Sequence, residues 1–343
     1  MPRTDPTGPG APAPAVPTDP AHVVWSDDFG AEFGARTPED RWAFVEGGGY
    51  TADDGVLTRV PGGLRITASG KHPVTGEPAF VQTIPQEEKN LSGLPGSGDH
   101  AKWIVYANHR ASTGFQGFDA PLGAVLSCEA VISGRSYGTA GHPFGDAVAD
   151  PEDDIRLAAA MMNTIDPETS TAFDFLLTDK RLYAFYGRPT FARGELGRYA
   201  SFAHTVALAD RSPQDRHHVK IAYNRSAGTV SWLVDGAEAL RVDRIGMRLS
   251  RDSLNLDEGG EEVLVVPRQL SVGMGLMTLL DGSWPTGRGL VRLSTGTTYY
   301  DPSAGEPVPQ TFVDEQSLDT SRIFGQGAEL TVADYTVAVT PLP

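Results

Sequence analysis

The sequence predicts an all-β protein built from two antiparallel sheets stacked as a sandwich. Its 343 residues include 39 Gly and 26 Pro, scattered between short apolar runs, as in chains of many turns and short strands. Several runs alternate, with Leu64, Ile66 and Ala68 apolar and Arg65 and Thr67 polar, which is typical of a strand with one buried face. No stretch has the apolar spacing of a long amphipathic helix.

Eighteen short segments, rich in apolar, β-branched and aromatic residues and separated by turn residues, are expected to form the strands. In chain order they are residues 23–29, 42–47, 55–60, 63–69, 79–84, 102–108, 124–135, 156–165, 171–179, 181–187, 202–208, 218–224, 229–236, 240–246, 262–267, 270–280, 291–300 and 329–339. Ala and Met in residues 156–165 suit a helix by propensity alone. The surrounding strand pattern favours a strand there.

Residues 1–21 are expected to form a disordered, Pro-rich tail before a single domain of residues 22–343. The first 20 residues hold seven Pro and two Gly and almost nothing apolar, a composition that does not form a packed core. This tail lacks the apolar stretch of a secretory signal, and no run approaches the ~20 apolar residues of a membrane span. A cytoplasmic location is therefore expected.

The net charge and the cysteine content exclude several classes of partner and site. The chain has 28 Lys and Arg against 44 Asp and Glu, a formal net charge of -16, which repels nucleic acids and anionic membranes. Neither is expected as a partner. Cys128 is the single cysteine, so an intrachain disulfide and a thiolate metal cluster are excluded. Its apolar, alternating surroundings predict a buried and inert thiol.

No metal or nucleotide cofactor is expected. The eight His show no metal-binding spacing, and the chain has no glycine-rich phosphate loop that leads from a strand into a helix. The acidic runs at Asp150 and Leu256 have oxygen ligands suited to Ca²⁺. A solvated acidic loop is the favoured interpretation of both.

Several motifs in order carry a family resemblance. They are WSDDF followed by Trp42, then DGVLTRVPGGLRITAS, HHVKIAYNRSAGTVSWLVDG, LSVGMGLMTLL and finally ELTVADYTVAV. Together they resemble the concanavalin-like lectin and glucanase superfamily, in particular family 16 glycoside hydrolases. The resemblance implies a jelly-roll sandwich with long loops around a cleft on its concave sheet.

The catalytic motif of those glycosidases is missing. The resemblance implies a Glu-x-Asp-x-x-Glu strand, whose two Glu act as nucleophile and general acid, since retaining hydrolysis uses two carboxyl groups ~5 Å apart. In residues 171–179 only Asp174 matches the motif's Asp, and the Glu positions hold Ala172 and Leu177. A standard glycoside hydrolase is therefore not expected.

Asp174 is the main candidate for catalysis. Because it stands between Phe173 and Phe175, an inward-facing side chain would have its pKa raised by burial, which suits a general acid or base. The alternative is an ion pair with Arg156. Tyr183 is a candidate hydroxyl donor to a ligand, against the alternative of a core tyrosine with an internal partner.

Candidate substrate-binding residues come from the neighbouring aromatic and Met-rich strands and from two long segments, 85–121 and 138–150, expected to wall the cleft. They are Met162, Phe185, Trp103, Tyr106, His109, Arg156 and Trp284.

These observations favour an enzyme that converts a small, largely apolar metabolite, such as a cyclase or isomerase of specialised metabolism, by acid–base or conformational catalysis. One alternative is a lectin-like module that binds an oligosaccharide without catalysis. Another is a glycosidase with a relocated carboxylate pair that includes Glu129. The oligomeric state is left open by the sequence.

Overall fold

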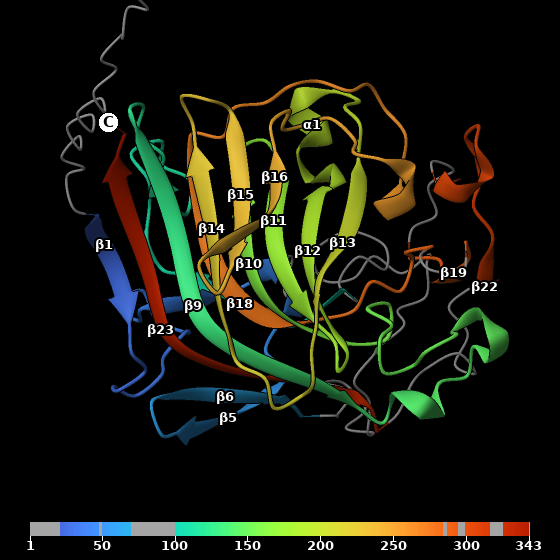
Figure 1. The fold of residues 1–343 in the computed structure, drawn as a ribbon, viewed down its shortest axis with the longest axis horizontal. Coiled ribbons are helices and arrows are strands. Elements are labelled where there is room, and N and C mark those ends of the chain that lie inside the picture. Colours follow the sequence, from blue (N-terminus) through green and yellow to red (C-terminus); the bar gives the residue numbers. More distant parts are fainter. Residues whose placement is uncertain are drawn as a thin grey trace, which may run out of the picture.

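The computed structural model describes residues 21–47, 50–69, 100–283, 287–293, 299–315 and 325–342. Over these ranges two large antiparallel sheets lie face to face (Figure 1). The α-helix in them is a single turn, α1 (Arg193–Leu196), and none of their helices is long and apolar enough to cross a membrane. The prediction of an all-β, two-sheet sandwich is confirmed.

The first sheet has eight strands and contains both ends of the described chain. Its order is β16 (Ala237–Val242), β15 (Thr229–Val234), β14 (His217–Asn224), β9 (Ala124–Tyr137), β23 (Gly327–Pro341), β6 (Gly63–Ala68) and β5 (Gly55–Val60), with β1 (His22–Asp27) also paired to β23. The long strands β9 and β23 run side by side across the molecule (Figure 1).

The second sheet has nine strands. Its order is β17 (Leu254–Asp257), β13 (Phe202–Asp210), β12 (Arg181–Arg188), β11 (Thr171–Leu177), β10 (Ala159–Asp166), β18 (Gln269–Met277), β7 (Ala101–Ala107) and β2 (Trp42–Phe44), with β8 (Phe118–Asp119) also paired to β18. Three small pairs complete the described strands: β3 (Glu46–Gly47) with β4 (Tyr50–Thr51), β19 (Gly289–Val291) with β22 (Phe312–Asp314), and β20 (Tyr300–Asp301) with β21 (Val308–Pro309).

Most expected strands are present, and two are wrong. Of the expected strand 291–300, only Val291, at the end of β19, and Tyr300, at the start of β20, are in strands among the described residues. The segment 156–165 forms a strand, β10, as expected. Residues 262–267 do not form one. Val263, Leu264 and Val266 are about half exposed, and the Val263 carbonyl accepts a hydrogen bond from the Arg188 side chain instead of a strand ladder. Strand β17 was not predicted. The expected strand 79–84 and the expected tail, except Ala21, lie outside the described residues.

Alternation divides the side chains of the second sheet between the core and the outer face. On β11, Phe173 and Phe175 point into the core between the sheets, so Asp174 points to the opposite face. Cys128 of β9 is in the same core, where burial raises the pKa of its thiol far above the usual value. The structure thus agrees with a buried, inert thiol.

Two sequence motifs have structural roles. In WSDDF, the Asp27 carboxylate accepts a hydrogen bond from the Trp42 indole at 2.8 Å, which holds β1 against β2. In WLVDG, Asp235 and Gly236 both have positive φ, 51° and 86°, as a type I′ hairpin turn requires. These residues therefore fix strand connections rather than a functional site.

Side-chain hydrogen bonds join the two sheets. The Tyr335 hydroxyl on β23 donates to the Gly273 carbonyl on β18 at 2.8 Å, and the Trp232 indole on β15 donates to the Asp174 carbonyl on β11 at 2.9 Å. Both rings are fully buried. The backbone of β11 and β18, which carries the site described below, is thus held by the other sheet.

Tyr335→Phe is expected to lower the free energy of unfolding by about 1–3 kcal/mol, because the Gly273 carbonyl loses its donor in a dry core. Urea denaturation measures this change. Tyr300→Phe is the matched control, since Tyr300 is only half-buried and no partner of its hydroxyl is found among the described residues. Equal stability of the two variants would contradict a structural role for the Tyr335 hydroxyl.

Candidate functional site

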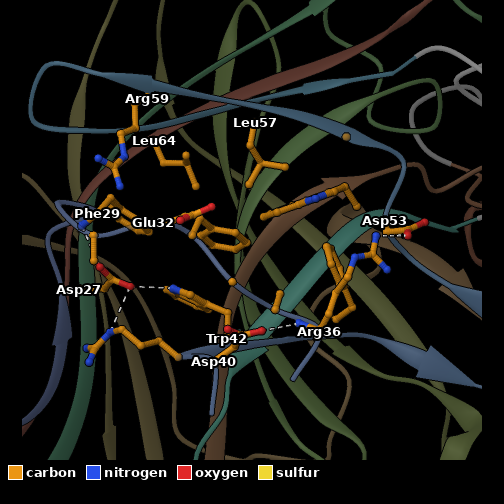
Figure 2. A pocket seen from close by; sticks show the side chains of 18 of the residues that line it. Asp27, Phe29, Glu32, Arg36, Asp40, Trp42, Asp53, Leu57, Arg59 and Leu64 are labelled. Atoms are coloured by element: carbon orange, nitrogen blue, oxygen red, sulfur yellow. Dashed lines mark hydrogen bonds and ion pairs between the residues drawn. The ribbon is translucent and has the colours of Figure 1, made fainter. Parts of the chain in front are cut away.

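Two pockets are candidates for a site. The larger, called the edge pocket, has a volume of about 990 Å³ and is lined by residues of the 27–44 segment together with β5, β6 and Trp103. Figure 2 shows that several of its charged groups face one another. Arg36 pairs with Asp53 at 2.6 Å and Arg41 with Asp27 at 3.3 Å. These contacts brace the N-terminal segment against the sandwich.

The second, called the sheet pocket, lies on the outer face of the nine-stranded sheet and has a volume of about 250 Å³. Most of its lining is apolar, and a few polar groups are buried among the apolar ones. The lining residues are His100, Ile104, Tyr106, Met161, Asn163, Ile165, Ala172, Asp174, Phe185, Pro189, Thr190, Phe191, Ser201, Phe202, Ala203, Leu256, Glu258, Met277, Leu279, Asp281, Leu293 and Tyr299. A concave, mainly apolar pocket with convergent polar groups is the default candidate for a ligand site.

A row of paired residues crosses five strands at the floor of this pocket. Phe185 on β12 pairs with Asp174 on β11, which lies opposite Asn163 on β10. Asn163 pairs with Gly273 on β18, and Gly273 with Tyr106 on β7. Because paired residues share a face of the sheet, this row places a carboxyl, an amide and a phenol side by side on the pocket floor.

Glycines in the same strands let large side chains lie flat on the sheet. A Cβ at Gly187 would lie 2.6 Å from the Phe185 ring, and one at Gly275 would lie 2.8 Å from Met161 Cε and 2.9 Å from Ile104 Cγ1. Real Cβ atoms do not approach other atoms so closely. The glycines therefore shape the apolar part of the floor.

Asp174 is buried at the centre of the floor, with 7% of its surface exposed. The Thr164 amide donates to Asp174 Oδ1 at 2.8 Å. Burial outweighs this hydrogen bond and raises the pKa of the Asp174 carboxyl to about 8. The alternative of an ion pair with Arg156 is wrong, because Arg156 pairs with Asp154.

A second polar cluster stands at the wall of the sheet pocket. Asp281 pairs with His100 Nε2 at 2.8 Å and accepts a hydrogen bond from the Tyr299 hydroxyl at 2.8 Å. The Ser201 hydroxyl donates to Glu258 at 3.0 Å. Burial, followed by the nearby charge of Asp281, raises the pKa of the Glu258 carboxyl. Among the residues that the structure describes, no three His, Cys, Asp or Glu are arranged to hold a metal ion.

The structure places three of the predicted site residues in the pocket lining: Asp174, Phe185 and Tyr106. Tyr183 and Arg156 were wrongly assigned to it. The Tyr183 hydroxyl donates to Asp153 at 2.8 Å inside a buried cluster. The Arg156 side chain, also buried, pairs with Asp154 at 2.5 Å and donates to the Ala147 carbonyl. Both residues hold the 139–157 segment against the sheet.

Met162 and Trp103 were also misplaced, because each points to the core face of its strand. Met162 lies between the two sheets, and its neighbour Met161 lines the sheet pocket instead. Trp103 is fully buried beside Phe33 and Phe44, with ring centroids 5.9 Å away in both cases. An alternating pattern shows which residues share a face, and it does not show which face is the core.

Glu129 lies on the other sheet. Its carboxylate is 3.2 Å from Lys220 Nζ and 3.5 Å from His218 Nε2 on the outer face of β9 and β14. The core separates this face from the sheet pocket, so Glu129 is excluded as a partner of Asp174. The glycosidase with a carboxylate pair that includes Glu129 is therefore wrong.

His109 is exposed outside the pocket, where it stacks on Phe118 and its Nδ1 lies 2.8 Å from the Gly117 carbonyl. Trp284 lies outside the described residues. Of the two expected walls, the segment 85–121 contributes His100, Ile104 and Tyr106, and the segment 138–150 contributes no lining residue. Residues 85–99 lie outside the described residues. The other walls come from the β12–β13 connection, from Glu258 and from the segment after β18.

Sequence reasoning missed Asn163, Glu258, Asp281 and His100. Asn163 had a usable signal, because it alternates with Met161 and Ile165 on a strand next to that of Asp174. The other three come from loops far apart in the chain. No spacing in the sequence brings them together.

Comparisons with known proteins found similar solved structures and similar sequences. Among solved structures, the endo-1,3-beta-glucanase of Streptomyces sioyaensis is similar, with 15% identity, a TM-score of 0.46 and coverage of 96% of this chain and 100% of that one. The endo-beta-1,3-glucanase of Pyrococcus furiosus has 13% identity, a TM-score of 0.43 and coverage of 94% and 96%. Both are glucanases, the group that the sequence motifs resemble.

Two matches in sequence are more direct. An uncharacterized protein of Acanthamoeba polyphaga mimivirus is 24% identical over 312 residues, which are 75% of this chain and 66% of the viral protein. A model of a family of unknown function, DUF6081, matches residues 26–341. This match spans both sheets, from β1 to β23. The chain therefore belongs to the DUF6081 family.

Proposed function

We propose that the sheet pocket binds a small, largely apolar metabolite and that Asp174 exchanges a proton with it. One observation carries the proposal: a buried carboxyl group, with a pKa raised to about 8, lies on the floor of a mainly apolar pocket. At pH 7 most of this carboxyl is protonated, so it is a proton donor to a ligand atom in contact with it.

The size of the pocket limits the ligand. Its volume of about 250 Å³ is below the ~300–1,000 Å³ of sites for drug-sized molecules. A long polysaccharide does not fit inside it. The side chains that surround the polar floor are Ile104, Met161, Phe185, Leu256 and Met277, and they favour a compact apolar skeleton.

Acid–base chemistry by one carboxyl group supports a rearrangement without a redox partner. Asp174 would give its proton to an alkene carbon or a carbonyl oxygen of the ligand, and the resulting carboxylate would then take a proton from another ligand atom. Atoms and electrons balance within the ligand, so the product has the mass of the substrate. An isomerisation or a cyclisation is of this kind.

The test uses the full chain and a complex extract of small metabolites. The extract is incubated with wild-type protein or with Asp174→Asn and analysed by liquid chromatography and mass spectrometry. We expect one compound to fall and another of equal mass to rise with the wild type, at least a hundredfold faster than with Asp174→Asn. Asp243→Asn is the control, since Asp243 is exposed and pairs with Arg241 at the surface.

Two outcomes contradict the proposal. One is an equal-mass conversion that Asp174→Asn leaves unchanged. The other is the absence of any conversion together with specific binding on an oligosaccharide array, which would support the lectin-like alternative.

A further inference from the structure

Among the residues that the structure describes, no Lys or Arg lines the sheet pocket. Its ionisable groups are the carboxyl groups of Asp174, Glu258 and Asp281, the imidazole of His100 and the phenols of Tyr106 and Tyr299. A pocket of one sign with low-dielectric walls concentrates ligands of the opposite sign. An anionic ligand would face only acidic groups and one imidazole that is already paired.

The three carboxyl groups are not equivalent. Asp174 is mostly neutral at pH 7, because burial raises its pKa to about 8. Asp281 is bound by the His100 imidazole and the Tyr299 hydroxyl, each at 2.8 Å. Glu258 accepts a hydrogen bond from the Ser201 hydroxyl, and it forms no ion pair with any residue that the structure describes. Glu258 is thus the carboxyl group available to a cation.

The nearest guanidinium group, that of Arg193, does not form an ion pair with Glu258. Arg193 attracts Glu258 through space, but its side chain donates to the carbonyls of Tyr199, Glu258 and Gly259 at 2.7–3.2 Å. It is not among the residues that line the pocket. A half-buried carboxylate without an ion pair is costly, and a cationic ligand would offset that cost.

An independent observation points to a hydrogen-bond donor in the ligand. Asn163 is 3% exposed. Its side chain forms a hydrogen bond with Tyr106, and its Oδ1 atom has no hydrogen-bond partner among the described residues. It lines the pocket beside Asp174. A buried acceptor without a partner costs about 1–3 kcal/mol, so an N–H group of a ligand that reached it would be favourable.

We propose that the ligand of the sheet pocket is a protonated amine on a compact apolar skeleton, with its ammonium group paired to Glu258. This inference rests on the proposed function, since it names the class of metabolite that the same pocket takes. The pocket lining also includes the aromatic rings of Phe185 and Tyr299, a residue type that attracts cations. Glu258 holds the ammonium group of the ligand.

The test compares three probes of the same size on the full chain: cyclohexylmethylamine, cyclohexylmethanol and cyclohexanecarboxylate. Calorimetric titration at pH 7 measures each Kd. We expect the amine to bind at least tenfold more tightly than the alcohol, and the carboxylate more weakly than the alcohol. Wild-type protein alone decides this comparison, so it does not depend on the folding of a variant.

Two variants test whether the ammonium group of the probe pairs with Glu258. Glu258→Gln is expected to weaken the amine about tenfold, to the Kd of the alcohol, and to leave the alcohol unchanged. Glu261→Gln is the matched control, because Glu261 is exposed three residues along and does not line the pocket. It should change neither Kd.

The outcomes separate the two proposals. If the alcohol binds as tightly as the amine, or if Glu258→Gln weakens the amine no more than Glu261→Gln does, the amine inference is overturned and the apolar pocket stands. If none of the three probes binds, the pocket itself is contradicted and the inference fails with it.

Discussion

Asp174→Asn is expected to be more stable than the wild type at pH 9, by as much as about 5 kcal/mol, and nearly equal to it at pH 4. In the unfolded chain the carboxyl ionises near pH 4, whereas in the folded chain its pKa is raised to about 8. Between these values the unfolded state releases a proton that the folded state keeps. Wild-type stability therefore falls as pH rises from about 4 to 8.

Asparagine removes this pH dependence and keeps the local contact. Its side-chain oxygen can accept the hydrogen bond that Asp174 accepts from the Thr164 amide at 2.8 Å, and it has no proton to lose. If Asp174→Asn loses the conversion of the ligand and gains stability, Asp174 is retained for function although it lowers the stability of the folded protein.

Urea denaturation of both proteins at several pH values between 4 and 9 measures the effect. His204 is a second buried group, whose pKa is lowered to about 3, so its contribution is lost as pH falls from about 6.5 to 3. This contribution is the same in both proteins and cancels in their difference. Parallel stability curves for the two proteins would contradict a buried neutral carboxyl at position 174.

Trp42→Ala is expected to lower the free energy of unfolding by about 3–5 kcal/mol, the usual range for a large aromatic removed from a core. Trp42 is 1% exposed and lies against Trp25 and Tyr335, at 5.0 and 5.3 Å between ring centroids. Its indole also donates to Asp27 at 2.8 Å, so the variant loses both packing and a hydrogen bond.

Chemical denaturation measures the loss of unfolding free energy. Two further variants separate the contribution of the hydrogen bond from that of packing and provide a surface control. Trp42→Phe keeps a ring and removes the donor to Asp27, so a smaller loss of about 1–2 kcal/mol is expected. Val56→Ala is the surface control, because Val56 is 55% exposed. A loss for Trp42→Ala no larger than that for Val56→Ala would refute the role of Trp42 in joining β1 and β2.

The sandwich was predictable, because it depends on local pattern. The position of Asp174 between Phe173 and Phe175 marked it as a candidate, and the sequence left open which face of the strand its carboxyl occupies. Phe185 followed from the same alternation on the next strand. Met162 was assigned to the wrong face by one residue, since two adjacent methionines satisfy the pattern equally well.

The sequence could not predict which residues meet through the register of distant strands and through loops. Asp174 and Asn163 line one pocket from the neighbouring strands β11 and β10, while Asp281, His100 and Tyr299 meet from different parts of the chain. Glu129 was assigned to the cleft wrongly. It lies on an alternating strand, but that strand belongs to the other sheet.

The sequence by itself determined that this chain is a β-sandwich with a carboxyl set between two aromatics and without the glycosidase pair. Those properties follow from alternation and from residue identity, which are local. Only the tertiary structure decided that Asp174, Asn163 and Tyr106 form one row, and that Glu258 stands at the wall of the same pocket. Strand order and register are set by the packing of the whole core, so they cannot be read from spacing along the chain.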